Sequence, residues 1–209
     1  AGVEPLVCGS MSGRTIAVGI VVQDSELTGP TGPRQAVSIS VNEIFMTAPE
    51  PQELVTTTPL ECPVWQSPPE PLDTPSNVVD IWRIRLPQAH HRECSHAARM
   101  TILRCYLGSD QAFELGRQSG GKPYLAPLGS GPEFNLSHTG GLALLAVSPQ
   151  HPVGIDIERV RHLRDPLRIA KRVLPSNVTA RLNQLHPDQL RHAFFNQWTR
   201  FEAIQKSAG

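Results

Sequence analysis

The stretch FNLSHTGGLALLAVSPQHPVGIDIERV, from Phe134 to Val160, decides the fold because it contains three extended segments in a row. FNLSH and LALLAVS flank TGG, a pattern typical of a β-hairpin. PVGIDIERV then predicts another strand, in which Asp156 and Glu158 lie two positions apart. Residues at i and i+2 of a strand point to the same side, so the two carboxylates should lie together.

Two carboxylates held close together repel each other unless a cation lies between them or one is protonated. Mg²⁺ is the cation that such a pair favours, because it binds a few carboxylates and keeps room for water and substrate phosphate oxygens. The alternative is a strand end whose acids are solvated or paired with Arg159 and Arg161. The octapeptide leaves both interpretations open.

The chain ends in HPDQLRHAFFNQWTRFEAIQKSAG, which predicts a long helix that begins at Pro187 and Asp188. An apolar stripe should run along one side of this helix. Its expected members are Leu190, Phe194, Phe201 and Ile204.

A second face of the same helix carries Trp198, Glu202 and Lys206, at i, i+4 and i+8. Glu202 is a candidate third metal ligand or general base, and Lys206 a candidate phosphate contact. For the helix alone, an ordinary surface pair of Glu202 and Lys206 is the competing interpretation.

Four further polar residues are candidates for binding a phosphate. Ser137 and His138 lie at a strand end, where a hydroxyl and an imidazole could donate to phosphate oxygens. Lys122 lies in the turn sequence GKPYL, and Arg99 in the predicted helix SHAARMTILRCYLG, with Ser95 as its cap. Each could instead be a solvated charge or, for His138, a histidine packed in a turn.

The segment HHRECSH has soft-metal ligand types within seven residues. A zinc site needs about four ligands in tetrahedral geometry, and no second pair of ligands follows nearby. We therefore interpret these residues as a loop and a helix start. They are His90, His91, Cys94 and His96.

The whole chain has 209 residues and a formal net charge of zero, which argues against bulk binding of nucleic acid or of a membrane surface. Its four cysteines form no CxxC motif, so a reduced, cytoplasmic protein is expected. Residues 1–76 are predicted to be a Pro-rich, largely irregular N-terminal extension, within which TIAVGIVV and QAVSISVNEIFM could be strands. VVDIWRIRL predicts a strand, and DPLRIAKRVL and VTARLNQL predict short helices.

GKPYL, FNLSHTGGLALLAVS, VGIDIERV and WTRFEAIQK, in this order, resemble the 4′-phosphopantetheinyl transferases of the Sfp type. The resemblance covers about Asn77 to Gly209. It implies an α+β fold of two similar halves, each a small antiparallel sheet packed on a long helix, with the active site in the cleft between them. The first half would be 77–153 and the second 154–209, with the second half apparently incomplete at its C-terminal end.

The same resemblance implies transfer of 4′-phosphopantetheine from coenzyme A to a serine of an acyl or peptidyl carrier protein, with release of 3′,5′-ADP. Mg²⁺, or Mn²⁺, would be the cofactor. A monomer is expected, with neither nucleic acid nor membrane as a partner. The implied metal ligands are Asp156, Glu158 and Glu202; the implied catalytic residues are Glu202 as base and Lys206; and the implied contacts to the coenzyme phosphates are Arg99, Lys122, Ser137 and His138.

Phe201 departs from the family pattern, which usually has a lysine immediately before the third acid. It falls on the expected apolar stripe of the helix, so the helix should accept it. The departure motivates an alternative function, a catalytically impaired relative that binds coenzyme A or a carrier protein.

Overall fold

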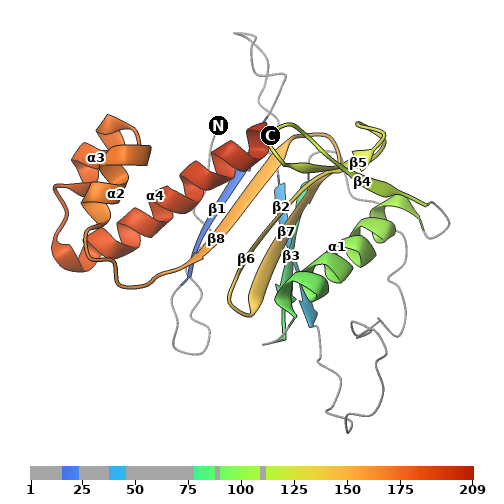
Figure 1. The fold of residues 1–209 in the computed structure, drawn as a ribbon, viewed down its shortest axis with the longest axis horizontal. Coiled ribbons are helices and arrows are strands. Elements are labelled where there is room, and N and C mark those ends of the chain that lie inside the picture. The colour runs from blue at the N-terminus through green and yellow to red at the C-terminus, as the bar shows by residue number, and fades with distance from the viewer. Residues whose placement is uncertain (1–15, 24–37, 46–77, 88–89, 109–111) are drawn as a thin grey trace, which may run out of the picture.

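The computed structural model describes residues 16–23, 38–45, 78–87, 90–108 and 112–209 (Figure 1). Within these ranges the chain forms three small β-sheets and four helices, so the predicted α+β class is confirmed. No helix of the described ranges has both the length and the hydropathy of a membrane-spanning segment.

A four-stranded sheet lies at the centre, in the order β2–β3–β7–β6. β2 runs parallel to β3, and the other neighbours are antiparallel. The predicted hairpin is confirmed as β6 and β7, and Gly140 in its turn has a φ of 56°, which glycine adopts without a Cβ penalty. The bounds are β2 (Ser38–Phe45), β3 (Val78–Arg85), β6 (Glu133–Thr139) and β7 (Leu142–Ser148).

Helix α1 (His91–Leu107) covers one face of this sheet (Figure 1). Its Ile102 and Leu103 pack against Trp82, Ile84 and other apolar residues of the sheet. The prediction that Ser95 caps this helix is wrong. The helix begins four residues earlier, at His91, and the Ser95 hydroxyl donates to the Arg92 carbonyl within the first turn.

Strands β1 (Ile16–Val22) and β8 (Val153–Arg159) form an antiparallel ribbon that pairs over all seven residues of each strand. Ile155 and Ile157 of β8 and Ile20 of β1 lie in one apolar cluster with Ile81 and Leu144 of the four-stranded sheet. The strands predicted in TIAVGIVV and QAVSISVNEIFM are thus confirmed as β1 and β2. The other residues of the N-terminal extension lie outside the described residues.

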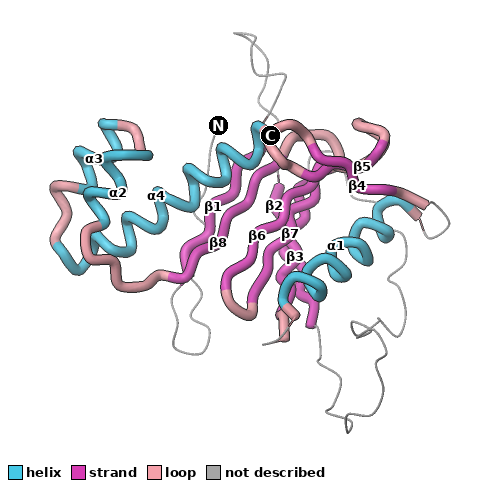
Figure 2. Tube along the Cα trace, viewed as in Figure 1, coloured by secondary structure: helices cyan, strands magenta, loops and turns pink. Residues whose placement is uncertain are grey.

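Helix α4 (Pro187–Ala208) covers the other face of the ribbon, and the short helices α2 (Pro166–Val173) and α3 (Ser176–Leu182) pack against α4 (Figure 2). Two glycines let α4 approach the strands closely. A Cβ on Gly19 of β1 would overlap the backbone of Thr199, and one on Gly154 of β8 would overlap the carbonyl oxygen of Ala203. The described residues therefore form four layers in the order α1, the four-stranded sheet, the β1–β8 ribbon and α4, and α2 and α3 pack on α4.

The stripe that α4 buries differs in part from the predicted one. Phe194 is buried and Phe201 packs against the same cluster, as predicted, but Ile204 is 49% exposed, so its prediction is wrong. Trp198 also belongs to this cluster and stacks on Phe194, with ring centroids 6.0 Å apart. The fully buried side of α4 consists of Phe194, Phe195, Thr199, Ala203 and Ser207.

A separate hairpin, β4 (Glu114–Arg117) and β5 (Pro123–Ala126), lies at the C-terminal end of α4. Its turn contacts this end directly, because a Cβ on Gly120 would overlap the backbone of Gly209. The extended segment predicted in GKPYL is confirmed as β5.

The close approach of β1 to α4 predicts that Gly19→Ala destabilises the protein. The added methyl would have to displace the helix backbone, and overpacking of this kind costs about 1–3 kcal/mol. The free energy of unfolding, measured by urea denaturation, should fall by that amount. Gly141→Ala is the matched control, since its nearest contact would be the Leu86 carbonyl oxygen at 3.3 Å. Equal stability of the two variants would contradict the packing of β1 on α4.

Candidate active site

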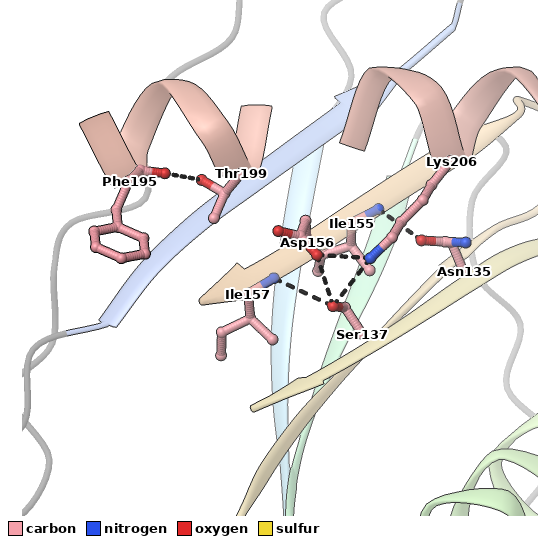
Figure 3. A network of polar contacts seen from close by, with 8 residues as sticks. All are labelled: Asn135, Ser137, Ile155, Asp156, Ile157, Phe195, Thr199 and Lys206. Carbon is pink, nitrogen blue, oxygen red and sulfur yellow. Dashed lines mark hydrogen bonds and ion pairs between the residues drawn. The ribbon is translucent and has the colours of Figure 1, made fainter. Parts of the chain in front are cut away.

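The carboxylate of Asp156 lies where β6, β8 and α4 meet, and its side chain is only 8% exposed. Its Oδ1 atom is 2.6 Å from Lys206 Nζ of α4 and accepts a hydrogen bond of 2.9 Å from Ser137 Oγ of β6 (Figure 3). Two other segments, β6 and α4, therefore place polar groups on one carboxylate oxygen of β8.

Ser137 contacts three other residues of this network through its hydroxyl group. Its hydroxyl donates to Asp156 and accepts from Lys206 Nζ at 3.2 Å and from the Ile157 backbone N–H at 3.3 Å. Two residues earlier on the same strand, Asn135 Oδ1 accepts from the Ile155 N–H at 2.9 Å. Side chains of β6 thus satisfy backbone donors of β8, which pairs along its length with β1 and not with β6.

Asn135 is a site residue that the sequence reasoning missed. Its signal was the alternation of the small polar residues Asn135 and Ser137 with the apolar residues Phe134 and Leu136. Both are buried, and buried polar groups are normally hydrogen-bonded, so the pair could have been assigned to one polar face.

The second oxygen of Asp156, Oδ2, is buried and has no hydrogen-bond partner in the described structure. An unsatisfied buried acceptor costs about 1–3 kcal/mol, unless a bound ligand satisfies it. Carboxylate oxygens suit hard cations such as Mg²⁺, so the donor chemistry fits a metal. Among the described residues no group of three or more His, Cys, Asp or Glu is close enough to form a metal site. The predicted metal set therefore stays a prediction.

Glu158 and Glu202, the other two predicted metal ligands, lie on β8 and α4. Glu158 lies two residues further along β8, on the same side as Asp156. Its Oε2 atom is 3.4 Å from the Arg161 guanidinium, so the alternative pairing foreseen for this acid is observed. Glu202 is half-buried and lies one helical turn before Lys206 on α4.

Two predicted phosphate contacts do not lie beside Asp156. Lys122 is buried, donates to the Ser207 carbonyl at 3.1 Å and pairs with Glu133 at 3.4 Å, so it ties the hairpin to the end of α4. His138 is exposed and points to the opposite side of β6 from Ser137.

Arg99 lies on α1 in a positively charged environment. It is 2.8 Å from the His96 ring, and its Nε atom is buried without a partner. Burial of the guanidinium, followed by the nearby charge of Arg117 on β4, lowers the pKa of Arg99 from its ordinary value. Arg117 is a second residue that the sequence reasoning missed. An anion between these two cations would relieve their repulsion.

The residues of HHRECSH do not act together. His91 begins α1, while Cys94 is buried in the core beneath that helix. His96 contacts Arg99, and its pKa is lowered by burial and then by the Arg99 charge.

Parts of this chain are similar to known proteins. The profile of the 4′-phosphopantetheinyl transferase superfamily matches residues 152–209, which include β8 and α4. The chain is 32% identical over 176 residues to the 4′-phosphopantetheinyl transferase HetI of Nostoc sp., an alignment that spans 69% of this chain and 74% of HetI. It is 32% identical over 127 residues to the 4′-phosphopantetheinyl transferase of Bacillus subtilis, across 57% of this chain and 55% of that protein. It is 37% identical over 128 residues to the transferase AcpT of Escherichia coli, across 61% of this chain and 63% of AcpT.

The site and these similarities define the class: the chain belongs to the 4′-phosphopantetheinyl transferase superfamily. The family and the enzyme class predicted from the sequence are therefore confirmed. The chain spans less than two thirds of the length of its Bacillus and Escherichia relatives.

The buried network predicts that Lys206→Met destabilises the protein more than the loss of an exposed lysine would. Removing Lys206 leaves the Asp156 carboxylate buried without its cation, which costs about 3 kcal/mol for a buried pair. Lys206→Met combined with Asp156→Asn should recover part of this loss. Chemical denaturation of Lys206→Met, of the double variant and of the wild type measures the loss of stability and its partial recovery. Lys171→Met, at an exposed position of α2, is the control, and an equal effect there would contradict the network.

Proposed function

We propose that this chain transfers the 4′-phosphopantetheine group from coenzyme A to a serine of a carrier protein. The observation that carries the proposal is the convergence of Ser137 and Lys206 on the buried carboxylate of Asp156. These three residues come from three of the four motifs that carry the superfamily resemblance. The names of HetI and AcpT, which describe transferases of this group, support the same reaction.

In the proposed reaction the serine hydroxyl of the carrier attacks the β-phosphorus of the coenzyme A pyrophosphate. A new phosphorus–oxygen bond forms as the bond to the bridging oxygen breaks, and 3′,5′-ADP leaves. Glu202 accepts the serine proton as general base, and Lys206 stabilises the charge that develops on the phosphate oxygens. Both residues lie on one face of α4, one turn apart.

The carboxylates of Asp156, Glu158 and Glu202 would hold Mg²⁺ or Mn²⁺. The unpartnered Oδ2 atom of Asp156 supports this assignment. The cation would supply charge neutralisation to the pyrophosphate and to the phosphoryl group in transfer. Lys206 already neutralises the other oxygen of Asp156, which limits the repulsion among the three acids.

The remaining cations are proposed to bind the other phosphates of coenzyme A. Among the described residues no salt bridge joins Arg99 of α1 or Arg117 of β4 to an acid, and Arg117 immediately precedes the turn that meets the end of α4. Lys122 and His138 keep their predicted role as phosphate contacts, although Lys122 would first have to leave its buried partners. We also propose that the sheet with α1 and the ribbon with α4 are the two halves of the family fold, with the coenzyme in the cleft between them.

The intact mass of a purified apo carrier protein tests the reaction. After incubation with this chain, coenzyme A and Mg²⁺, the carrier should gain one phosphopantetheine, and EDTA should abolish the gain. No gain with any acyl or peptidyl carrier would contradict the proposed activity.

Asp156→Asn should reduce transfer to background in the same assay, because an amide cannot replace the charged carboxylate as a metal ligand. Asp188→Asn is the matched control, since this exposed acid lies at the start of α4 and outside the site. Circular dichroism confirms that each variant is folded. Turnover like that of the wild type in Asp156→Asn would reject its role.

A second candidate function is favoured by Phe201, which packs in the apolar cluster beneath α4 where the family usually has a lysine. In that case the chain would bind coenzyme A or a carrier protein without turnover. Tight binding of coenzyme A in a titration, together with no mass gain on the carrier, would support this candidate. Measurable transfer would remove it.

A further inference from the structure

Lys206 lies in the last turn of α4, where a helix is normally held least firmly. The last four carbonyl groups of a helix have no partner within the helix, so its final turn frays unless other segments bind it. Here the Nζ atom of Lys206 nevertheless lies 2.6 Å from Asp156 Oδ1 and 3.2 Å from Ser137 Oγ (Figure 3). The contacts that hold this turn therefore bear on the position of Lys206.

Ser207, the next residue of α4, is 2% exposed and is bound by two other segments. Its hydroxyl accepts a hydrogen bond of 3.0 Å from Gln23 Nε2 and donates one of 2.8 Å to the Ile204 carbonyl. Its own carbonyl accepts from Lys122 Nζ at 3.1 Å. The side chain of Ser207 is thus tied to the end of β1, and its backbone to the turn of the β4–β5 hairpin.

The backbone of Gln23 is fixed by the β1–β8 ribbon. Gln23 directly follows β1, and its N–H donates to the Pro152 carbonyl at 2.9 Å, which continues the pairing of the two strands by one residue. The side chain is half-buried. Because the backbone is already ordered, only the side chain of Gln23 loses conformational entropy when it binds Ser207. The contact is therefore well suited to hold the end of α4.

Lys122 is the less permanent of the two anchors under the proposed function. That function assigns the Lys122 ammonium to a phosphate of coenzyme A, and Lys122 would have to release the Ser207 carbonyl to reach it. Gln23 is uncharged, so a bound phosphate attracts its side chain far less. The hydrogen bond from Gln23 to Ser207 would then continue to hold the last turn of α4 while coenzyme A is bound.

We propose that Gln23 is a positioning residue for the proposed transfer reaction. By holding Ser207, it keeps the last turn of α4 in place and the Lys206 ammonium against the Asp156 carboxylate. The catalytic importance of Lys206 rests on the proposed function, whereas its placement by Gln23 is independent of that function. Strand β1, which lies outside the residues that carry the family resemblance, thereby takes part in the candidate active site.

The placement of Lys206 can be measured directly, because the chain has only three lysines, Lys122, Lys171 and Lys206. A brief pulse of the N-hydroxysuccinimide ester of acetic acid, read by peptide mass spectrometry of the full chain, gives the reactivity of each amine. Gln23→Met removes the donor and keeps the length of the side chain. It should raise the reactivity of Lys206 about fivefold, the factor expected for the loss of one hydrogen bond. Lys171 is exposed, and its reactivity should stay constant as the internal reference.

Ser207→Ala removes the other partner of the same bond and should raise the reactivity of Lys206 in the same way. Adding Gln23→Met to Ser207→Ala should have no further effect, because the contact is already broken. Gln205→Met is the matched control, since Gln205 is exposed in the same turn of α4, and it should change the reactivity of Lys206 less than about twofold. Unchanged reactivity of Lys206 in both Gln23→Met and Ser207→Ala would overturn the role of Gln23.

The transfer assay separates the role of Gln23 from the proposed function. In Gln23→Met, checked by circular dichroism to be folded, kcat should fall about fivefold, with the KM values for coenzyme A and for the carrier unchanged. A general loss of stability would not change the reactivity of Lys206 in the folded protein. Faster labelling of Lys206 in Gln23→Met, without transfer even by the wild type, would support the positioning and reject the proposed function. Transfer by the wild type, with an equal kcat and equal Lys206 labelling in Gln23→Met, would support the function and overturn the positioning.

Discussion

The contact between Lys206 and Asp156 is the interaction on which the arrangement of this chain depends. A carboxylate that is almost fully buried must be neutralised and hydrogen-bonded, and here a lysine from the last helix and a serine from β6 do both. The contact forms only if α4 lies very close to β8. Gly154 makes this approach sterically feasible, because any side chain there would collide with Ala203. One glycine and one ion pair thus fix the helix against the strand.

Strand β1 also holds β8 and α4 in place. It pairs with β8 on one side and carries Gly19 beneath α4, so β8 is held in a ribbon with its apolar residues facing the central sheet. The polar side of β8 then faces α4 and the Asn135 and Ser137 side chains. Because successive residues of a strand alternate, the same seven residues serve the core through Ile155 and Ile157 and the site through Asp156 and Glu158.

Much of this organisation follows from periodicity in the sequence. The hairpin, the strand of Asp156 and the last helix were predicted from alternation and from helical spacing, and the motif order indicated the superfamily. The start of α1 was missed because Ser95 is a good cap by type, whereas packing of Cys94 extends the helix past it. Ile204 was assigned to the core from spacing alone, but the close approach at Gly154 turns Ala203 and Ser207 inward instead.

The polar partners were harder to predict, because they are set by contacts between distant segments. No local sequence pattern predicts that Lys122 donates a hydrogen bond to the end of α4. Nor does one predict that Arg117 lies near enough to Arg99 to lower its pKa.

Titration of coenzyme A into the wild-type chain and into Asp156→Asn, each with and without Mg²⁺, tests the central role of Asp156 most directly. The account predicts that Mg²⁺ tightens coenzyme A binding in the wild type, and that this gain is lost in the folded Asp156→Asn variant while metal-free binding persists. An equal gain from Mg²⁺ in both proteins would contradict it.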